Sequence, residues 1–411
     1  MRSKKFLFLT LILCLALSSS ALAQTHITFW HAMSGELGNA IDHLTAEFNA
    51  QNPDIVVESI YQGRYGDLNT KLVASLSART TPTIAQVYEN WTDSFFRHGV
   101  LVPLSHYMDL SDEEFNNYIE VFRGMNTWDG ELYTIPYNKS NWVLFYNADM
   151  IPNPPKTVEE FLQISKDITA KTNGETRGFG IRPTLELFHA FLYVGGGDFL
   201  DEDLNVTFNS PEGKAALELM IGMLDDGSAL LIDGYENEAF GDSMIAMYIG
   251  SSAGMPHVEN SVGDKFQFST APIPAGVRPG APFMGTNIAL FAAATEEERE
   301  AAGKFVKFIT NTENTVYFAI KTGYLPVTYS GLNSAEYQQF LADNPHKAAV
   351  ANLDAFEYGY WQPTIAAWEE ARSAIGIAVE RVFLGEPMDL VLDEAQMLVE
   401  EAIDEMLSQR Y

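Results

Sequence analysis

The stretch from Tyr133 to Asn147 constrains the fold more than any other part of this chain. It follows Asp129-Gly130, a dipeptide that favours a tight hairpin turn because glycine accepts a positive φ. Its ends are rich in β-branched and aromatic residues, which predicts a strand, but residues 138–141 read Asn-Lys-Ser-Asn. We interpret it as a strand that crosses between two lobes, with its polar residues at the floor of a ligand-binding cleft. A solvated loop between two strands is the alternative, and spacing alone does not separate the two.

Strand and helix patterns alternate before this crossing. Strands are predicted at 27–30, 55–61 and 83–88, and amphipathic helices lie between them. The alternation predicts an α/β fold in which helices cover a mostly parallel sheet. Ligands of such sheets bind beyond the carboxyl ends of the strands, so the residues at these ends should share one rim. They are Trp30-His31, Tyr61 to Tyr65, and Tyr88-Glu89.

The second half of the chain repeats this alternation. A strand at 283–292 is predicted to cross back between the lobes. The sequence Gly-Tyr-Leu-Pro at 323–326 interrupts the helical pattern and is predicted to cross between the lobes a third time. The tail reads as helices at 334–342, 364–383 and 390–407. In the last of these, the residues expected to face a core are Leu390, Ala395, Leu398, Ala402 and Leu407.

These crossings predict a two-lobe organisation behind an export signal. Residues 1–23 are basic, then apolar, and end in Ala-Leu-Ala, which is typical of a cleaved signal peptide. Residues 24–137 with about 287–325 would form the first lobe, and residues 138–286 with about 326–411 the second. We therefore expect a periplasmic or other extracytoplasmic protein.

The only cysteine, Cys14, lies within the predicted signal peptide. The preceding Leu13 is too large for a good lipid-attachment sequence, which favours plain cleavage over a lipoprotein. The mature chain would then contain no thiol and no disulfide, consistent with an oxidising compartment.

Composition limits the partners. The formal net charge is −30, so nucleic acid and anionic membrane surfaces are not expected to bind. Beyond the signal, no apolar run approaches the roughly 18 residues of a membrane span. Hydrophobic residues make up 46% of the chain, enough for two cores, and we expect a monomer.

The sequence offers no pattern for a metal, a cofactor or catalysis. The eight histidines are scattered, without a ligand pair at helical spacing. Neither a nucleophile elbow nor a phosphate-cradling loop with its lysine is present. We predict no metal, no cofactor and no enzymatic role, although missing motifs alone do not exclude an enzyme.

Aromatic residues and one arginine are the candidate binding groups. Rings at a cleft suit sugar faces or quaternary ammonium groups, but each ring taken alone is more often part of a core. Arg372 lies in a helix with apolar neighbours and needs an anionic partner, either a ligand or Glu369 or Glu370. The candidate rings are Trp30, Tyr61, Tyr65, Tyr88, Trp142 and Trp361.

Several motifs resemble one protein family. They are FWHAMSGELG (29–38), FNAQNP (48–53), QGRYGD (62–67), PTIAQVYE (82–89), the Asp-Gly-x-x-Tyr-x-x-Pro-Tyr-Asn of the crossing strand, and KTGYLPVT (321–328). Together they resemble the extracytoplasmic solute-binding proteins of bacterial ABC importers. Within that sugar-binding, maltose-binding-protein-like family, they are most similar to the branch that captures glycerol-3-phosphate and glycerophosphodiesters such as glycerophosphocholine.

This resemblance implies a type II periplasmic-binding-protein fold, with mixed sheets flanked by helices and a multi-strand hinge. It also implies capture of the solute between the lobes and delivery to a membrane permease. Tyr65 and Glu89 would hold the glycerol or choline side of the ligand. The residues implied around the phosphate are Ser140, Ser251 or Ser252, Gly285, Tyr324 and Arg372.

The sequence departs from the family pattern at places that affect the ligand. Ala253-Gly254 stands where the family pattern has Gly-Ser, Met284 replaces a glycine, and Trp142 stands where a smaller residue is common. A neutral mono- or oligosaccharide is therefore the alternative ligand, and an acidic partner for Arg372 would favour it. A secreted glycerophosphodiester hydrolase and a scaffold or adhesin are the alternatives of other classes.

Overall fold

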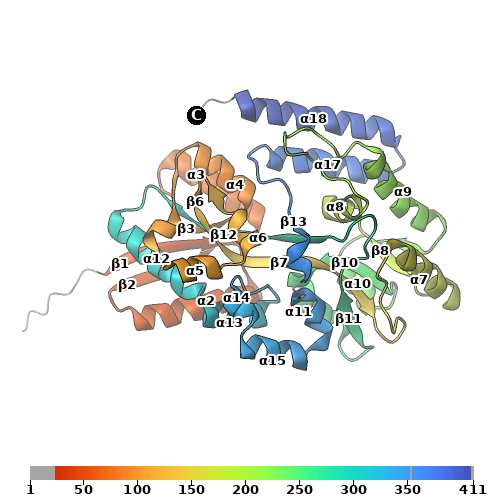
Figure 1. The fold of residues 1–411 in the computed structure, drawn as a ribbon, viewed down its shortest axis with the longest axis horizontal. Helices are drawn as coiled ribbons and strands as arrows, with labels where there is room; N and C mark the ends of the chain where they lie inside the picture. Colours follow the sequence, from red (N-terminus) through yellow and green to blue (C-terminus); the bar gives the residue numbers. More distant parts are fainter. Residues whose placement is uncertain (1–23, 352–353, 409–411) are drawn as a thin grey trace, which may run out of the picture.

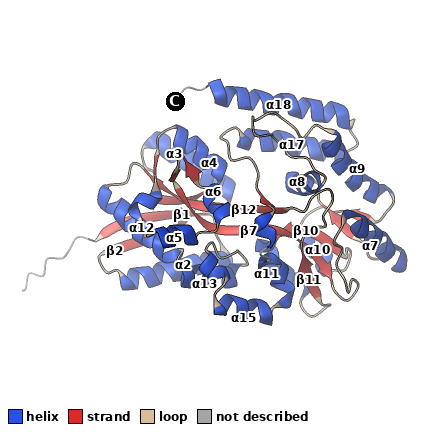
Figure 2. Ribbon diagram, in the orientation of Figure 1, coloured by secondary structure: helices blue, strands red, loops and turns tan. Residues whose placement is uncertain are grey.

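The computed structural model describes residues 24–351 and 354–408, so the predicted signal peptide lies outside the described residues. Two groups of elements lie side by side, and β7 (Thr134–Asn147) and β12 (Ala281–Phe291) extend between them (Figure 1). Helices flank the strands in both groups (Figure 2). The predicted two-lobe α/β architecture is confirmed.

One nine-stranded sheet extends through both lobes. Its order is β10-β7-β12-β3-β1-β2, while β11 pairs with β7 and both β4 and β13 pair with β12. Two further pairs, β5 with β6 and β8 with β9, form separate two-stranded sheets. The bounds of the strands besides β7 and β12 are β1 (Thr25–His31), β2 (Ile55–Tyr61), β3 (Ile84–Val87), β4 (Leu101–Val102), β5 (Thr127–Trp128), β6 (Glu131–Leu132), β8 (Phe179–Ile181), β9 (Ala229–Leu231), β10 (Met247–Ser251), β11 (Phe268–Ala271) and β13 (Gly359–Tyr360).

Helices account for most of the rest of the described chain. They are α2 (Gly35–Gln51), α3 (Tyr65–Ala78), α4 (Glu89–Arg97), α5 (Asp112–Asn117), α6 (Glu120–Gly124), α7 (Val158–Lys171), α8 (Leu185–Val194), α9 (Pro211–Asp225), α10 (Glu236–Gly241), α11 (Met255–Val262), α12 (Glu296–Ile309), α13 (Thr312–Thr322), α14 (Tyr329–Leu332), α15 (Ala335–Asp343), α16 (Asp354–Glu357), α17 (Trp368–Phe383) and α18 (Met388–Ser408). Within the described ranges, no helix has both the length and the apolar character that crossing a membrane requires.

The crossing strand β7 is continuous and buried almost throughout, which rules out the solvated-loop interpretation. Asn138 and Lys139 have no exposed surface, and Ser140 and Asn141 are nearly as buried. The first half of β7 pairs antiparallel with β12, and the second half pairs with β10. Polar residues therefore lie within the sheet where the lobes meet, and each must find a partner there.

The return crossing is confirmed as β12, whose register on β7 shifts between Thr286 and Asn287. Gly285 adopts φ +121° beside this irregularity. A Cβ atom at Gly285 would lie 1.9 Å from the carbonyl oxygen of Asn138. Glycine is thus required here both by the backbone conformation and by the close approach of β7.

The third segment predicted at the hinge also lies against β7. Helix α13 ends at Gly323, which has the left-handed φ of +79° that is typical of a helix C-terminus. The backbone N–H of Leu325 then donates to the carbonyl oxygen of Lys139 at 2.7 Å. Three chain segments are therefore hydrogen-bonded around the middle of β7.

The sheet is parallel along β2-β1-β3 and between β12 and β13, while β12 pairs antiparallel with both β3 and β7. The alternating strands and helices of the first lobe predicted its parallel part correctly. The two expected mixed sheets are joined into one, because β7 and β12 belong to both lobes.

Two helical predictions need correction. Helix α17 begins at Trp368 rather than at residue 364, because the backbone N–H of Ala366 donates to Asp93 Oδ2 instead of entering a helical turn. On α18, Ala395 and Ala402 are buried as predicted, whereas Leu390, Leu398 and Leu407 are exposed. The buried face of α18 consists of Val391, Leu392, Ala395, Val399, Ala402, Ile403 and Met406.

We expect Gly285→Ala to lower the free energy of unfolding by about 1–3 kcal/mol, because the methyl group forces β7 and β12 apart at a positive φ. Gly376→Ala is the control: Gly376 lies in α17 with open space around it, and alanine should stabilise that helix by about 0.5–1 kcal/mol. Urea unfolding of both variants measures the difference. Equal stabilities would contradict the proposed constraint.

Candidate ligand-binding site

Two adjoining cavities form one cleft beside the crossing strands. They enclose about 290 and 470 Å³ and share Tyr65, Tyr88, Met284 and Gly285 in their walls. We call the smaller cavity the aromatic end; it is lined by Tyr88, Trp91, Phe283, Trp361, Trp368, Glu369 and Arg372, among others. We call the larger cavity the polar end; it is lined by Ser140, Trp142, Arg182, Glu186, Glu236, Ser251 and Tyr324, among others.

Most of the site residues named from the sequence line this cleft. Glu89, Trp361 and Arg372 lie at the aromatic end, Ser140, Trp142, Ser251 and Tyr324 at the polar end, and Tyr65 and Gly285 at both.

Four predicted residues do not line the cleft. Tyr61, the last residue of β2, is exposed and lines neither cavity. Trp30 packs against the core cluster that contains Leu68, and His31 is buried, with Nδ1 accepting from the backbone N–H of Met33. The Ser252 hydroxyl accepts from the backbone N–H of Asn141 at 3.3 Å. The side chains of Trp30, His31 and Ser252 support the strands near the cleft rather than facing its interior.

Neutral hydroxyl groups gather at the floor of the polar end. Ser251 Oγ, at the end of β10, donates to Ser140 Oγ on β7 at 3.1 Å. The hydroxyl of Tyr65 accepts from Asn138 Nδ2 at 3.2 Å. Burial raises the pKa values of the Tyr65 and Tyr324 hydroxyls, so both stay protonated and can donate to a ligand.

Glu89 is paired with a buried lysine. Lys139 Nζ lies 2.5 Å from Glu89 Oε1, and that carboxylate also accepts from Asn287 Nδ2 at 2.9 Å. Burial lowers the pKa of Lys139, while the neighbouring carboxylate acts in the opposite direction. The contact joins the first residue of α4 to the middle of β7, and it balances the charge of Glu89 within the protein.

Arg372 lines the cleft, but its guanidinium has an acidic partner. Its Nη2 atom lies 2.7 Å from Glu186 Oε1, in the first turn of α8. The sequence had offered Glu369 or Glu370 as alternative partners, and that assignment is wrong. An anionic ligand at Arg372 would therefore have to compete with Glu186.

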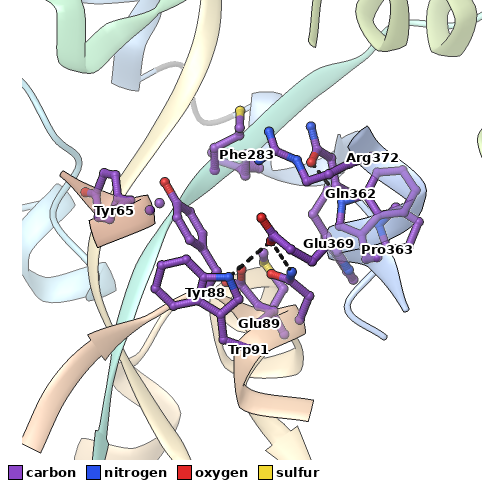
Figure 3. A pocket seen from close by; sticks show the side chains of 16 residues that line it. Tyr65, Tyr88, Glu89, Trp91, Phe283, Gln362, Pro363, Glu369 and Arg372 are labelled. Atoms are coloured by element: carbon purple, nitrogen blue, oxygen red, sulfur yellow. Dashed lines mark hydrogen bonds between the residues drawn. The ribbon is translucent and has the colours of Figure 1, made fainter. Parts of the chain in front are cut away.

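Glu369 instead connects α17 to α4. Its Oε2 atom accepts from Asn90 Nδ2 at 2.9 Å and from Trp91 Nε1 at 3.2 Å. Figure 3 shows this carboxylate between the rings of Tyr88 and Trp91 and the side chain of Arg372. In the part of the chain that the structure describes, no lysine, arginine or histidine forms an ion pair with Glu369.

The sequence reasoning missed a second charged pair in the cleft. Arg182 Nη1 lies 3.3 Å from Glu236 Oε2, and its guanidinium packs over the ring of Tyr235. Arg182 directly follows β8, and Glu186 is in the first turn of the next helix. The rule that ligands bind beyond the carboxyl ends of strands, applied to the second lobe, would have found both residues.

The fold is that of the two-lobe, type II periplasmic binding proteins. UgpB from Mycobacterium tuberculosis, solved in complex with glycerophosphocholine, aligns with a TM-score of 0.83 and 23% identity, covering 93% of this chain and 100% of that one. An ABC substrate-binding protein from Listeria monocytogenes, in complex with cycloalternan, aligns with a TM-score of 0.78 and 22% identity, covering 93% and 98%.

The family assignment follows from the sequence. Residues 43–349 match the family described as bacterial extracellular solute-binding protein, and the chain belongs to that family. It is also 28% identical, over 365 residues and 82% of both chains, to the sn-glycerol-3-phosphate-binding periplasmic protein UgpB of Salmonella typhimurium.

Lys139→Met should lower the free energy of unfolding by about 3–5 kcal/mol, because it leaves the Glu89 carboxylate without its buried counterion. Adding Glu89→Gln should recover part of the loss. Lys166→Met removes the solvent-exposed pair with Asp226 and should change stability by at most about 1 kcal/mol. Denaturant unfolding that ranks the two lysine variants equally would refute a structural role for the buried pair.

Proposed function

We propose that this protein is the solute-binding component of an ABC importer that captures a glycerol phosphate compound, either glycerol-3-phosphate or a glycerophosphodiester such as glycerophosphocholine. One observation carries the proposal. The Arg372 guanidinium and the hydroxyl groups of Ser140, Ser251 and Tyr324 line a single cleft. A guanidinium with neutral hydroxyl donors is the chemistry that holds a phosphate group.

Local charge favours a diester over a doubly charged monoester. Arg372 already faces Glu186, and Arg182 faces Glu236, so the cleft offers little net positive charge. A phosphodiester carries one negative charge and repels these carboxylates less than a dianion does. Glycerophosphocholine also has a positive group that the remaining carboxylates can attract.

Binding is proposed to close the cleft. The first lobe would comprise residues 24–137 with about 287–325, and the second would comprise residues 138–286 with about 326–411. On that division, Tyr65 and Glu89 contact the solute from one lobe, and Ser251 and Arg372 contact it from the other. A solute that touches both lobes stabilises the closed state and shifts the equilibrium toward it.

Family membership supports a binding role rather than the secreted hydrolase considered from the sequence. The periplasmic relatives support a location outside the cytoplasm, where a monomeric binding protein would deliver its solute to a membrane permease. Delivery follows when the permease binds the closed form in preference to the open form.

Calorimetric titration with glycerophosphocholine and glycerol-3-phosphate tests the ligand. Arg372→Ala should weaken binding of either phosphate compound about 100-fold, because charge-assisted hydrogen bonds to the phosphate are lost. Glu186→Gln should tighten it about ten-fold, since a competing carboxylate is removed. Arg381→Ala is the control, because Arg381 lies further along α17 and pairs with Glu386 and Glu394.

A neutral mono- or oligosaccharide is the second candidate, and the ion pair between Arg372 and Glu186 favours it. Paired carboxylates and guanidinium groups suit the hydroxyls of a sugar, and aromatic rings suit its faces. Titration with a sugar panel separates the candidates. Binding of a sugar without binding of either phosphate compound would leave the fold standing and refute the phosphate ligand.

A further inference from the structure

The charged groups of the cleft leave one carboxylate without a counterion. Among the described residues, Glu89 pairs with Lys139, Glu186 with Arg372, and Glu236 with Arg182. Glu369 accepts two N–H groups through Oε2 alone. These hydrogen bonds orient the carboxylate, but no positively charged side chain in the described part of the chain neutralises it. The Glu369 side chain lines the cavity.

The surroundings of Glu369 are aromatic. Trp91, Trp368 and Phe283 are buried in the wall of the aromatic end, and Tyr88 and Trp361 complete it. The Trp91 ring also donates its N–H to Glu369, and its edge packs against Tyr88 with ring centroids 5.0 Å apart. A carboxylate in a cavity lined by aromatic rings attracts an organic cation, because both the charge and the ring quadrupoles favour it.

The spacing on α17 places the two charged contacts close together. Glu369 and Arg372 are three residues apart, so they lie on one face of the helix with Cβ atoms about 5–6 Å apart. In a phosphocholine group, only a two-carbon spacer separates the phosphate from the trimethylammonium group. Arg372 and Glu369 therefore match the order and separation of charges in a zwitterionic headgroup.

We propose that the aromatic end of the cleft binds the ammonium headgroup of the solute, with Glu369 as its counterion. The proposal rests on the proposed function and narrows it to zwitterionic glycerophosphodiesters. It also moves the cation away from Glu89, where the sequence had placed the choline side, because Lys139 already neutralises that carboxylate. Glu89 is then an acceptor for the glycerol hydroxyls.

The experiment compares glycerophosphocholine with the isostere in which a tert-butyl group replaces trimethylammonium. Calorimetric titration of the protein should give about ten-fold tighter binding of glycerophosphocholine. Glu369→Gln should abolish that preference while leaving affinity for the isostere unchanged, because glutamine still accepts from Asn90 and Trp91. Glu370→Gln, at the adjacent exposed position, should retain it.

A preference that persists in Glu369→Gln, or an equal loss for both compounds, would overturn the cation site while the proposed function stood. A titration with choline alone, measured by quenching of tryptophan fluorescence, tests the cation site independently of the proposed function. If neither phosphate compound binds but choline quenches the wild type and not Glu369→Gln, the proposed function is wrong and the cation site remains. If choline quenches neither protein, the cation site is refuted as well.

Discussion

The antiparallel pairing of β7 with β12 is the interaction on which the rest of the structure depends. Both strands extend through the two lobes (Figure 1), so the backbone hydrogen bonds between them join the lobes. The polar residues 138–141 of β7 are tolerated in this buried position because the side chain of each makes at least one hydrogen bond or ion pair. Asn138, for example, accepts from Gln86 and Thr286 and donates to Tyr65. The crossing therefore both joins the lobes and lines the cleft.

The buried pair of Lys139 and Glu89 adds a constraint on this crossing. Removing a lysine from water is costly, and only a close carboxylate with further hydrogen bonds offsets that cost. Asn287 and the backbone of Gly285, both on β12, supply those further contacts. The pair fixes the start of α4 against the crossing strands, and it places Glu89 at the cleft as a neutralised group. Because Lys139 already neutralises Glu89, that carboxylate is not available as the counterion of a cationic group in the ligand.

Sequence patterns predicted the elements well where one physical rule dominates. The boundaries of β2 agree with the predicted ones, because its run of β-branched and aromatic residues leaves no competing choice. On α18 the pattern failed, because leucines are present on both faces and only packing against α17 decides which are buried. Family motifs identified individual residues that line the cleft, but they did not identify the ion-pair partners of Arg372 and Glu89. Long-range ion pairs depend on how lobes are assembled, which local spacing does not encode.

The distribution of charge, rather than the shape of the cleft, separates the ligand classes. A dianionic monoester, a zwitterionic diester and a sugar could each fit in a cleft with hydroxyl groups at one end and rings at the other. Because the arginines Arg182 and Arg372 are each matched by a carboxylate, adding a dianion leaves excess negative charge. Adding a zwitterion leaves the total unchanged and gives Glu369 a counterion. On this balance of charge, a zwitterion matches the cleft better than a dianion does.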